Sequence, residues 1–163
     1  MYSYRSRWSL FLILPLMSLL SSCGKPKVDL QAPPEPGAAR TLSDVVAEDL
    51  VKKNSQDLYS RLDWGFQNIV RSPMDVEKVL EKMFAQYGQP VQCEIKVSQL
   101  GQKMDGLQMR PTRVFWYAVK TTKYPKGKYF LKVEIIRSVG GSTIDVSGFG
   151  FLSFEKGTPS YLK

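Results

Sequence analysis

The sequence contains no histidine and only two cysteines, Cys23 and Cys93. Without histidine, the chain has neither the Ser-His and Cys-His pairs that activate catalytic nucleophiles nor a His-ligated metal site. Two cysteines cannot form a zinc knuckle, and they allow at most one disulfide. These absences exclude the commonest hydrolytic and zinc-dependent chemistries, and we expect no metal or cofactor.

Acidic residues are also few. The sequence has 15 Asp and Glu against 23 Lys and Arg, which gives a formal net charge of +8. The 163 residues have room for one domain of ordinary size. With 43% apolar and 12% aromatic residues, that domain can bury a core, so we expect a folded protein rather than a disordered one.

Long apolar runs are scarce, and the one near the start covers residues 10–20 (LFLILPLMSLL). It follows a polar stretch that carries Arg5 and Arg7 and no acidic residue. A helix of this length spans about 17 Å, well short of a ~30 Å hydrocarbon core. The pattern predicts a secretory signal peptide over residues 1–22. The alternative, a buried N-terminal helix, is disfavoured by Pro15 in the middle of the run.

The end of that run, Leu20-Ser21-Ser22-Cys23, resembles the lipobox of bacterial lipoproteins. The resemblance implies that Cys23 is acylated, becomes the new N-terminus and attaches the protein to a membrane. Each buried CH₂ of an acyl chain stabilises attachment by about 0.8 kcal/mol. Gly24 stands where an aspartate commonly signals inner-membrane retention, so we expect the outer membrane, facing the periplasm. The alternative is ordinary cleavage, with Cys23 free or paired with Cys93.

Residues 24–40 (GKPKVDLQAPPEPGAAR) contain four prolines, two glycines and almost no large apolar side chain. This composition is typical of an extended, semi-rigid spacer. We therefore expect residues 23–40 to be a lipidated cysteine and a Pro-rich tether, and residues 41–163 to be the folded domain.

Helices are expected first in that domain. Thr41 or Ser43 can cap a helix that carries acidic residues early. The pattern predicts either one long helix over about 43–70 or two helices that meet near Asn54-Ser55. The apolar residues that should share its face are Val51, Leu58, Leu62, Phe66 and Ile69. A further helix is expected from the cap Ser72 to Gly88, with an apolar stripe at helical spacing.

After Pro90 the apolar period changes to two, which predicts strands over 91–100, 112–122, 128–139 and 142–154. We expect a loop over 101–111 and a tight hairpin at Gly140-Gly141. In the last strand, one face should carry Ile144, Val146, Gly148, Gly150, Leu152 and Phe154. The predicted class is α+β, with N-terminal helices packed on a curved four-stranded antiparallel sheet.

This order of elements resembles the NTF2-like, or cystatin-like, superfamily, in particular its uncharacterised small envelope lipoproteins. The resemblance covers about residues 42–154 and rests also on the stretches Val114–Tyr117 and Val146–Phe149. It implies a cone enclosed by helices and sheet, and it makes a homodimer a further expectation. Members include enzymes, ligand binders and scaffolds, so the fold alone does not choose a function.

Enzymes of this superfamily place an Asp/His or Asp/Tyr pair inside the cone, and the absence of histidine excludes the first. The second pair remains an alternative, with Glu134 and Asp145 as the mid-strand carboxylates and Tyr117 and Tyr129 as the candidate donors. Strand parity turns both carboxylates outward, so we expect them to be solvated or ion-paired rather than catalytic. Cys93 alternates with polar residues and is expected to be a small core hydrophobe. If the cone is open, the expected pocket lining is Phe84, Trp116, Tyr117 and Tyr129.

The charge is uneven, with twelve basic and five acidic side chains in residues 91–163. Five lysines gather around one predicted hairpin: Lys120, Lys123, Lys126, Lys128 and Lys132. They either face anionic headgroups or an acidic partner, or they simply keep an edge strand soluble. Export makes nucleic acid an unexpected partner.

The sequence therefore predicts a non-enzymatic, membrane-anchored envelope lipoprotein whose domain makes protein–protein contacts in the periplasm. The alternative is a binder of a small apolar or amphipathic ligand in the cone pocket. An enzyme would need a buried carboxylate of raised pKa inside the concavity.

Overall fold

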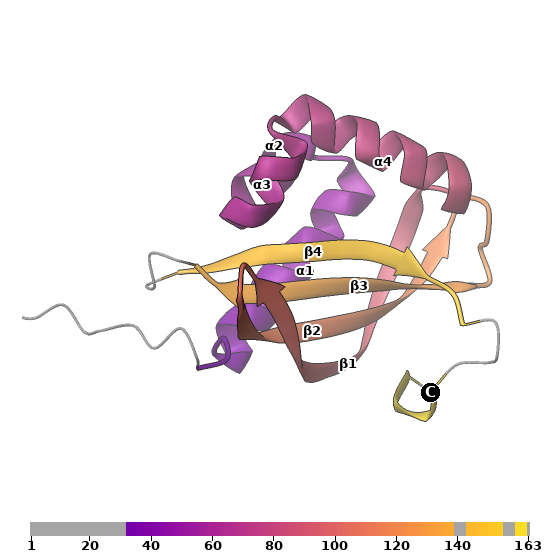
Figure 1. Ribbon diagram of the computed structural model, residues 1–163. Coiled ribbons are helices and arrows are strands. Elements are labelled where there is room, and N and C mark those ends of the chain that lie inside the picture. The colour runs from indigo at the N-terminus through magenta and orange to yellow at the C-terminus, as the bar shows by residue number, and fades with distance from the viewer. Residues whose placement is uncertain (1–31, 139–142, 155–158, 163) are drawn as a thin grey trace, which may run out of the picture.

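The computed structural model describes residues 32–138, 143–154 and 159–162, and it confirms the α+β class. The elements are α1 (Pro36–Lys52), α2 (Ser55–Arg61), α3 (Trp64–Val70), α4 (Pro73–Tyr87), β1 (Pro90–Asp105), β2 (Gln108–Thr121), β3 (Tyr129–Arg137), β4 (Ile144–Leu152) and a short 3-10 helix, η1 (Ser160–Leu162). The four strands form one antiparallel sheet in the order β1-β2-β3-β4 (Figure 1). Within these residues, no helix is both long enough and apolar enough to cross a membrane.

The first helix starts earlier than the sequence predicts, inside the segment expected as tether. The carboxylate of Glu35 accepts hydrogen bonds from the backbone N–H groups of Gly37 and Ala38, at 3.0 and 2.7 Å. These two bonds satisfy N–H groups that a helix start leaves free, and Pro36 suits the first helical position. Residues 36–40 are therefore helical, and the expected start at Thr41 or Ser43 is wrong.

The chain leaves the helical path twice between α1 and α3. The expected break near Asn54 is confirmed, because Lys53 adopts a left-handed φ of 58° and Asn54 caps α2. An unexpected second break follows at Asp63, whose carboxylate caps α3. Because of this break, Ile69 does not share a buried face with Leu58, and it is 77% exposed. Helix α4 is as predicted, with its cap at Ser72.

Residues 101–111 are not a loop but the distal half of a long β-hairpin. Pairing between β1 and β2 continues to Asp105↔Gln108, and the turn is at Gly106, where φ is 62°. Gly101, which was expected to mark a loop, allows the backbone of β1 to pack closely against side chains of β2. A Cβ atom there would lie 2.8 Å from Thr112 Oγ1 and 2.9 Å from a methyl of Val114.

The last strand changes face halfway along its length. Val146 pairs with Ile135 but Gly148 pairs with Glu134, so Ser147 is an extra residue in a β-bulge. Beyond the bulge Phe149 and Phe151, not Gly148 and Gly150, join Val146 on the helix-facing side. The expected single face is therefore wrong. The predicted Gly140-Gly141 hairpin lies outside the described residues.

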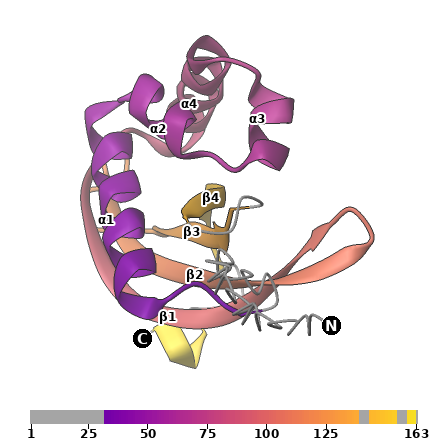
Figure 2. The same ribbon diagram turned by 90° about the vertical axis from the view of Figure 1, so that its left-hand side faces the viewer.

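Both faces of the sheet carry apolar clusters. The larger cluster lies between the helices and the sheet, where Leu50, Leu58 and Leu131 are fully buried. Each such side chain contributes about 1.5–3 kcal/mol by leaving water. The smaller cluster lies on the opposite face and joins Val114 and Trp116 to Leu162 of η1. Figure 2 shows α1 along one side of the sheet, α2 and α4 above it, and the distal hairpin curling outward toward α3.

Candidate functional site

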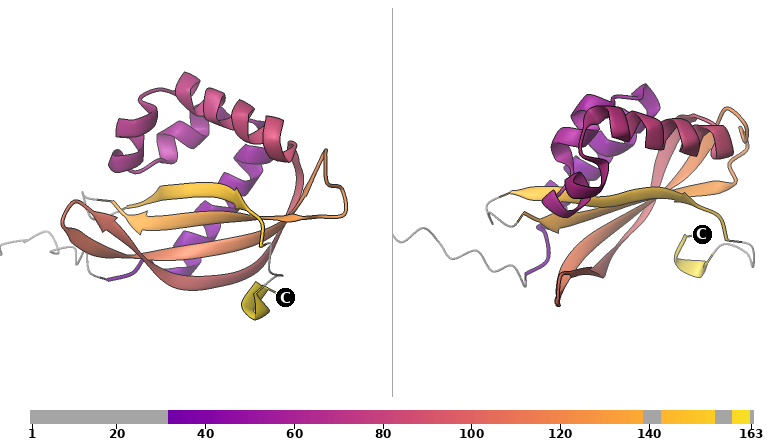
Figure 3. Two further views of the ribbon diagram at one scale, coloured as in Figure 1. Left: turned by 45° about the vertical axis from the view of Figure 1, so that its right-hand side comes forward. Right: turned by 45° about the horizontal axis from the view of Figure 1, so that its top comes forward.

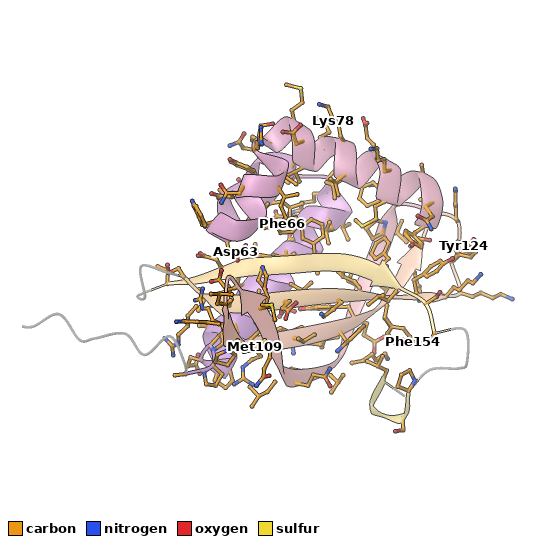
Figure 4. The ribbon with its side chains drawn as sticks, in the orientation of Figure 1. Asp63, Phe66, Lys78, Met109, Tyr124 and Phe154 are labelled. Carbon is orange, nitrogen blue, oxygen red and sulfur yellow. The ribbon has the colours of Figure 1, made fainter. Side chains whose placement is uncertain are left out.

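A cleft of about 380 Å³ lies between α3, the distal β1–β2 hairpin and the edge strand β4. Its apolar walls come from Phe66 and Ile69 of α3, Met104 of the hairpin and Phe149 of β4. Its polar end contains Asp63 and Lys103. In Figure 4, Asp63 and Phe66 lie above the hairpin and Met109 lies below them.

Asp63 connects three elements at the polar end of the cleft. One of its carboxylate oxygens caps α3 by accepting from the Phe66 N–H at 2.8 Å. The other is 3.3 Å from Lys103 Nζ, which also donates to the Ser147 carbonyl at 2.9 Å. The Asp63 N–H donates to the Val146 carbonyl at 2.9 Å. One aspartate therefore fixes the helix start, the hairpin and the edge of β4 relative to one another.

A buried arginine, Arg110, holds the hairpin in its curled position. It is 4% exposed, its Nη1 lies 2.6 Å from Asp105 Oδ2, and its Nη2 donates to the Arg137 carbonyl. Asp145 lies nearby, and its pKa is raised mainly by burial and further by the charge of Asp63, while Arg110 opposes the shift. The cleft thus rests on partly buried charges, of which Asp63 pairs with Lys103 and Asp105 with Arg110, while Asp145 has no ion-pair partner among the described residues.

Large apolar side chains remain exposed on both sides of the cleft. We call this set the apolar end: Ile69, Met104, Leu107 and Met109. Leu107, at the hairpin turn, is fully exposed, and Met104 is 70% exposed. Grouped exposed apolar side chains of this size are typical of interaction surfaces.

The four residues predicted to line a cone pocket lie in separate places. Tyr117 faces the helices, where its hydroxyl lies 2.6 Å from Ser43 Oγ and donates to Asp44 at 2.7 Å, and burial raises its pKa. Trp116 lies on the opposite face of the sheet, against Phe154. The structure therefore does not bring these two aromatic residues into one pocket.

The other two residues of that set are also apart. Phe84 lines a pocket of about 260 Å³ beside α4, with Lys53 and Glu77. Tyr129 packs edge-on against Tyr87 and Tyr124, with ring centroids 4.9 and 5.1 Å apart. Neither residue lines the cleft between α3 and the hairpin.

Glu134 and Cys93, the other residues considered for catalysis, are held by contacts within the fold. Glu134 is ion-paired with Lys132 at 3.3 Å and accepts a hydrogen bond from Thr112 at 2.8 Å. Cys93 is half-buried, and burial raises the pKa of its thiol to about 11. Cys23 lies outside the described residues. In the part of the chain that the structure describes, no group of three or more acidic or cysteine side chains could hold a metal ion.

Sequence reasoning missed the cleft because it placed Lys103, Met104 and Leu107 in a loop. The signal that could have revealed it is the run of apolar residues in a segment expected to be polar, where Met104, Leu107 and Met109 recur within six residues. Ile69 was missed because the break at Asp63 rotates it out of the predicted helical face.

Comparisons with models of protein families, with curated proteins and with solved structures find no match for this chain. Its function must therefore be inferred from the residues and contacts above.

Proposed function

We propose that the protein is a non-enzymatic, lipid-anchored lipoprotein of the bacterial envelope whose NTF2-like domain binds a protein partner at its apolar end. In this proposal residues 1–22 are an export leader, and Cys23 carries the lipid in the outer membrane. The order of helices before an antiparallel sheet supports the NTF2-like assignment. The observation that carries the function is the set of large apolar side chains exposed around a preformed cleft.

The last residues of the tether are bound to the sheet, which supports a defined orientation. Arg113 Nε donates to the Pro34 carbonyl at 3.1 Å, and Arg137 donates to the carbonyls of Ala32 and Pro33 at 3.2 and 3.3 Å. Nine residue steps separate Cys23 from Ala32, which is a reach of about 28 Å for an extended chain. A lipid on Cys23 would hold this end of the domain toward the membrane.

The cleft has the features of a binding hot spot. A partner's apolar side chain in the cleft would contact Phe66, Ile69 and Met104 and lose much of its contact with water. Each large side chain buried in this way contributes about 1.5–3 kcal/mol. The ion pair of Asp63 with Lys103 would form part of a polar rim. These elements suit contact with a protein surface that presents an apolar anchor.

A second candidate function is the binding of a small apolar or amphipathic ligand in the same cleft. Its volume of about 380 Å³ falls at the lower end of the size typical of ligand sites. Its charged lining residues, Asp63, Lys103 and Asp105, would orient such a ligand. This location differs from the cone lined by aromatic residues that the sequence suggested.

Site-specific photocrosslinking in cells tests the proposal. A photoreactive residue replaces Met104 in one variant and Val91 in another; both are exposed residues of β1, but at opposite ends of the strand. We expect a discrete crosslinked protein at position 104 and none at 91. We also expect Ile69→Glu to abolish the crosslink, because it puts a charge on the cleft wall.

Three outcomes would overturn parts of the proposal. Equal crosslinking at 104 and 91 contradicts docking at the apolar end. A crosslink only to a second copy of the chain would make this end a homodimer interface. An unchanged mass and detergent partitioning of Cys23→Ser would contradict the lipid anchor.

A further inference from the structure

The connection between β2 and β3 is a compact basic surface. Residues 120–128 (KTTKYPKGK) contain four lysines and no acidic residue. We call this segment the basic turn: Lys120, Lys123, Lys126 and Lys128, with Tyr124 between them. All four lysines are exposed. Among the described residues, no carboxylate lies within ion-pair distance of Lys120, Lys126 or Lys128.

The basic turn is held rigidly by aromatic packing. Tyr124 and Tyr129 pack edge to face, and Lys128 Nζ lies over both rings, 5.1 and 5.6 Å from their centroids. Gly127 supplies the positive φ of 77° that the turn requires. Lys123 Nζ donates to the Ala85 carbonyl near the end of α4. Two of the four positive charges, those of Lys123 and Lys128, are therefore held in place before any ligand arrives.

A small hollow lies at the base of the turn. It has a volume of about 210 Å³ and is lined in part by Lys120 and Lys126. The acidic residue in its lining, Glu94, is already paired with Lys96 at 2.8 Å. The hollow therefore presents two lysines to an incoming anionic side chain.

The basic turn and the bound end of the tether lie at opposite ends of the same two strands. The pairing of β2 with β3 runs from Thr112↔Ile136, beside Arg113 and Arg137, to Val119↔Tyr129, beside the turn. Seven residue steps separate these pairs, which is about 23 Å. Figure 3 shows the β2–β3 connection projecting away from the start of α1.

We propose that the basic turn binds an acidic segment of a polypeptide. The choice of a polypeptide over lipid headgroups rests on the hollow, because a concave site of about 210 Å³ receives a projecting carboxylate side chain rather than the flat surface of a bilayer. Acidic side chains of the partner bind Lys126 and Lys128 on the turn and Lys120 at the hollow. The contact is electrostatic, so its affinity falls as salt rises.

The test measures binding of a labelled oligoglutamate peptide to the full chain purified in a neutral detergent, with an oligoglutamine peptide as the uncharged control. We expect binding of oligoglutamate alone, and we expect the double variant Lys126→Gln/Lys128→Gln to bind it roughly three- to tenfold more weakly. The matched control, Lys78→Gln/Lys82→Gln, removes two exposed lysines of α4 and should bind normally. Lys126→Arg/Lys128→Arg keeps the charges and should also bind normally.

Equal weakening by both glutamine pairs would overturn the proposal, because net charge alone would then explain binding. A preference for micelles that contain an anionic phospholipid over oligoglutamate would assign the basic turn to lipid headgroups instead. Neither result affects the crosslink at position 104 or the mass of the Cys23 lipoprotein, so failure here is distinguishable from failure of the proposed function.

Discussion

The two ends of the sheet differ in surface chemistry, since one is apolar and the other basic, and they are held in place by different kinds of contact. The apolar end exposes Met104 and Leu107 on a hairpin that is held by partly buried ion pairs. The basic turn exposes lysines on a short connection that is held by aromatic packing and backbone contacts. The apolar end and the basic turn therefore depend on different sets of residues, so each can be weakened without the other.

The largest expected effect is at Gly88, which packs against the basic turn, and Gly88→Ala should destabilise the protein by about 3 kcal/mol. Gly88 has a φ of 81°, and a Cβ atom would lie 2.7 Å from the backbone nitrogen of Lys123. Urea unfolding measures the loss, and oligoglutamate binding should weaken with it. Gly150→Ala is the control, because its Cβ would meet no atom within 4 Å. Equal stability of the two variants would show that this close approach is not required.

Gly101→Ala is the corresponding change at the apolar end, with an expected loss of about 2 kcal/mol. The new methyl group would push against Thr112 and Val114, which are both buried. Hydrogen exchange should accelerate in the distal hairpin and stay unchanged in residues 120–128. Faster exchange at the basic turn as well would contradict the independence of the two ends.

Lys103→Met removes one cation from the cleft while keeping most of the aliphatic stem. We expect a loss of about 1 kcal/mol, because the buried carboxylate of Asp63 and the Ser147 carbonyl each lose a hydrogen bond. Crosslinking at position 104 should become weaker, since the hairpin is less firmly placed. If stability and crosslinking both stay at the wild-type level, the ion pair does not position the hairpin.

The smallest expected effect concerns Asp145, whose raised pKa means that its ionisation opposes folding. Asp145→Asn should therefore stabilise the protein at neutral pH, by less than about 1 kcal/mol because the site is partly solvated. The advantage should shrink as the pH falls through the raised pKa and the wild-type carboxyl becomes protonated. Unfolding curves at a series of pH values check this, and a gain that is independent of pH would contradict it.

Local sequence signals predicted the elements whose boundaries depend on local chemistry. Ser72, Pro73 and Gly88 mark the two ends of α4, and the period-two pattern gave the order of the strands. The start of α1 was missed because a glutamate, Glu35, caps it from within a Pro-rich stretch. This capping residue is less common than serine or asparagine.

Features that depend on distant contacts could not be predicted. Gly101 resembles a loop residue until Thr112 and Val114 are known to lie across from it. The bulge at Ser147 exchanges the two faces of β4 from that residue onward, and no local sequence pattern predicts it. The cleft could not be predicted for both reasons, because it forms where the hairpin that was expected to be a loop meets the edge of β4. The predicted aromatic residues Trp116 and Tyr117 are neighbours in sequence, and strand parity alone places them on opposite faces.

Oxidation of three native methionines tests docking at the apolar end most directly. Met104 and Met109 belong to that end, while Met74 of α4 is 64% exposed and serves as an internal control. Intact envelopes and the purified protein are treated with peroxide, and each sulfoxide is quantified by mass spectrometry. We predict that Met104 and Met109 are protected in envelopes, whereas Met74 is oxidised equally in both samples. If all three methionines are oxidised at the same rate in envelopes as in the purified protein, no partner covers the apolar end.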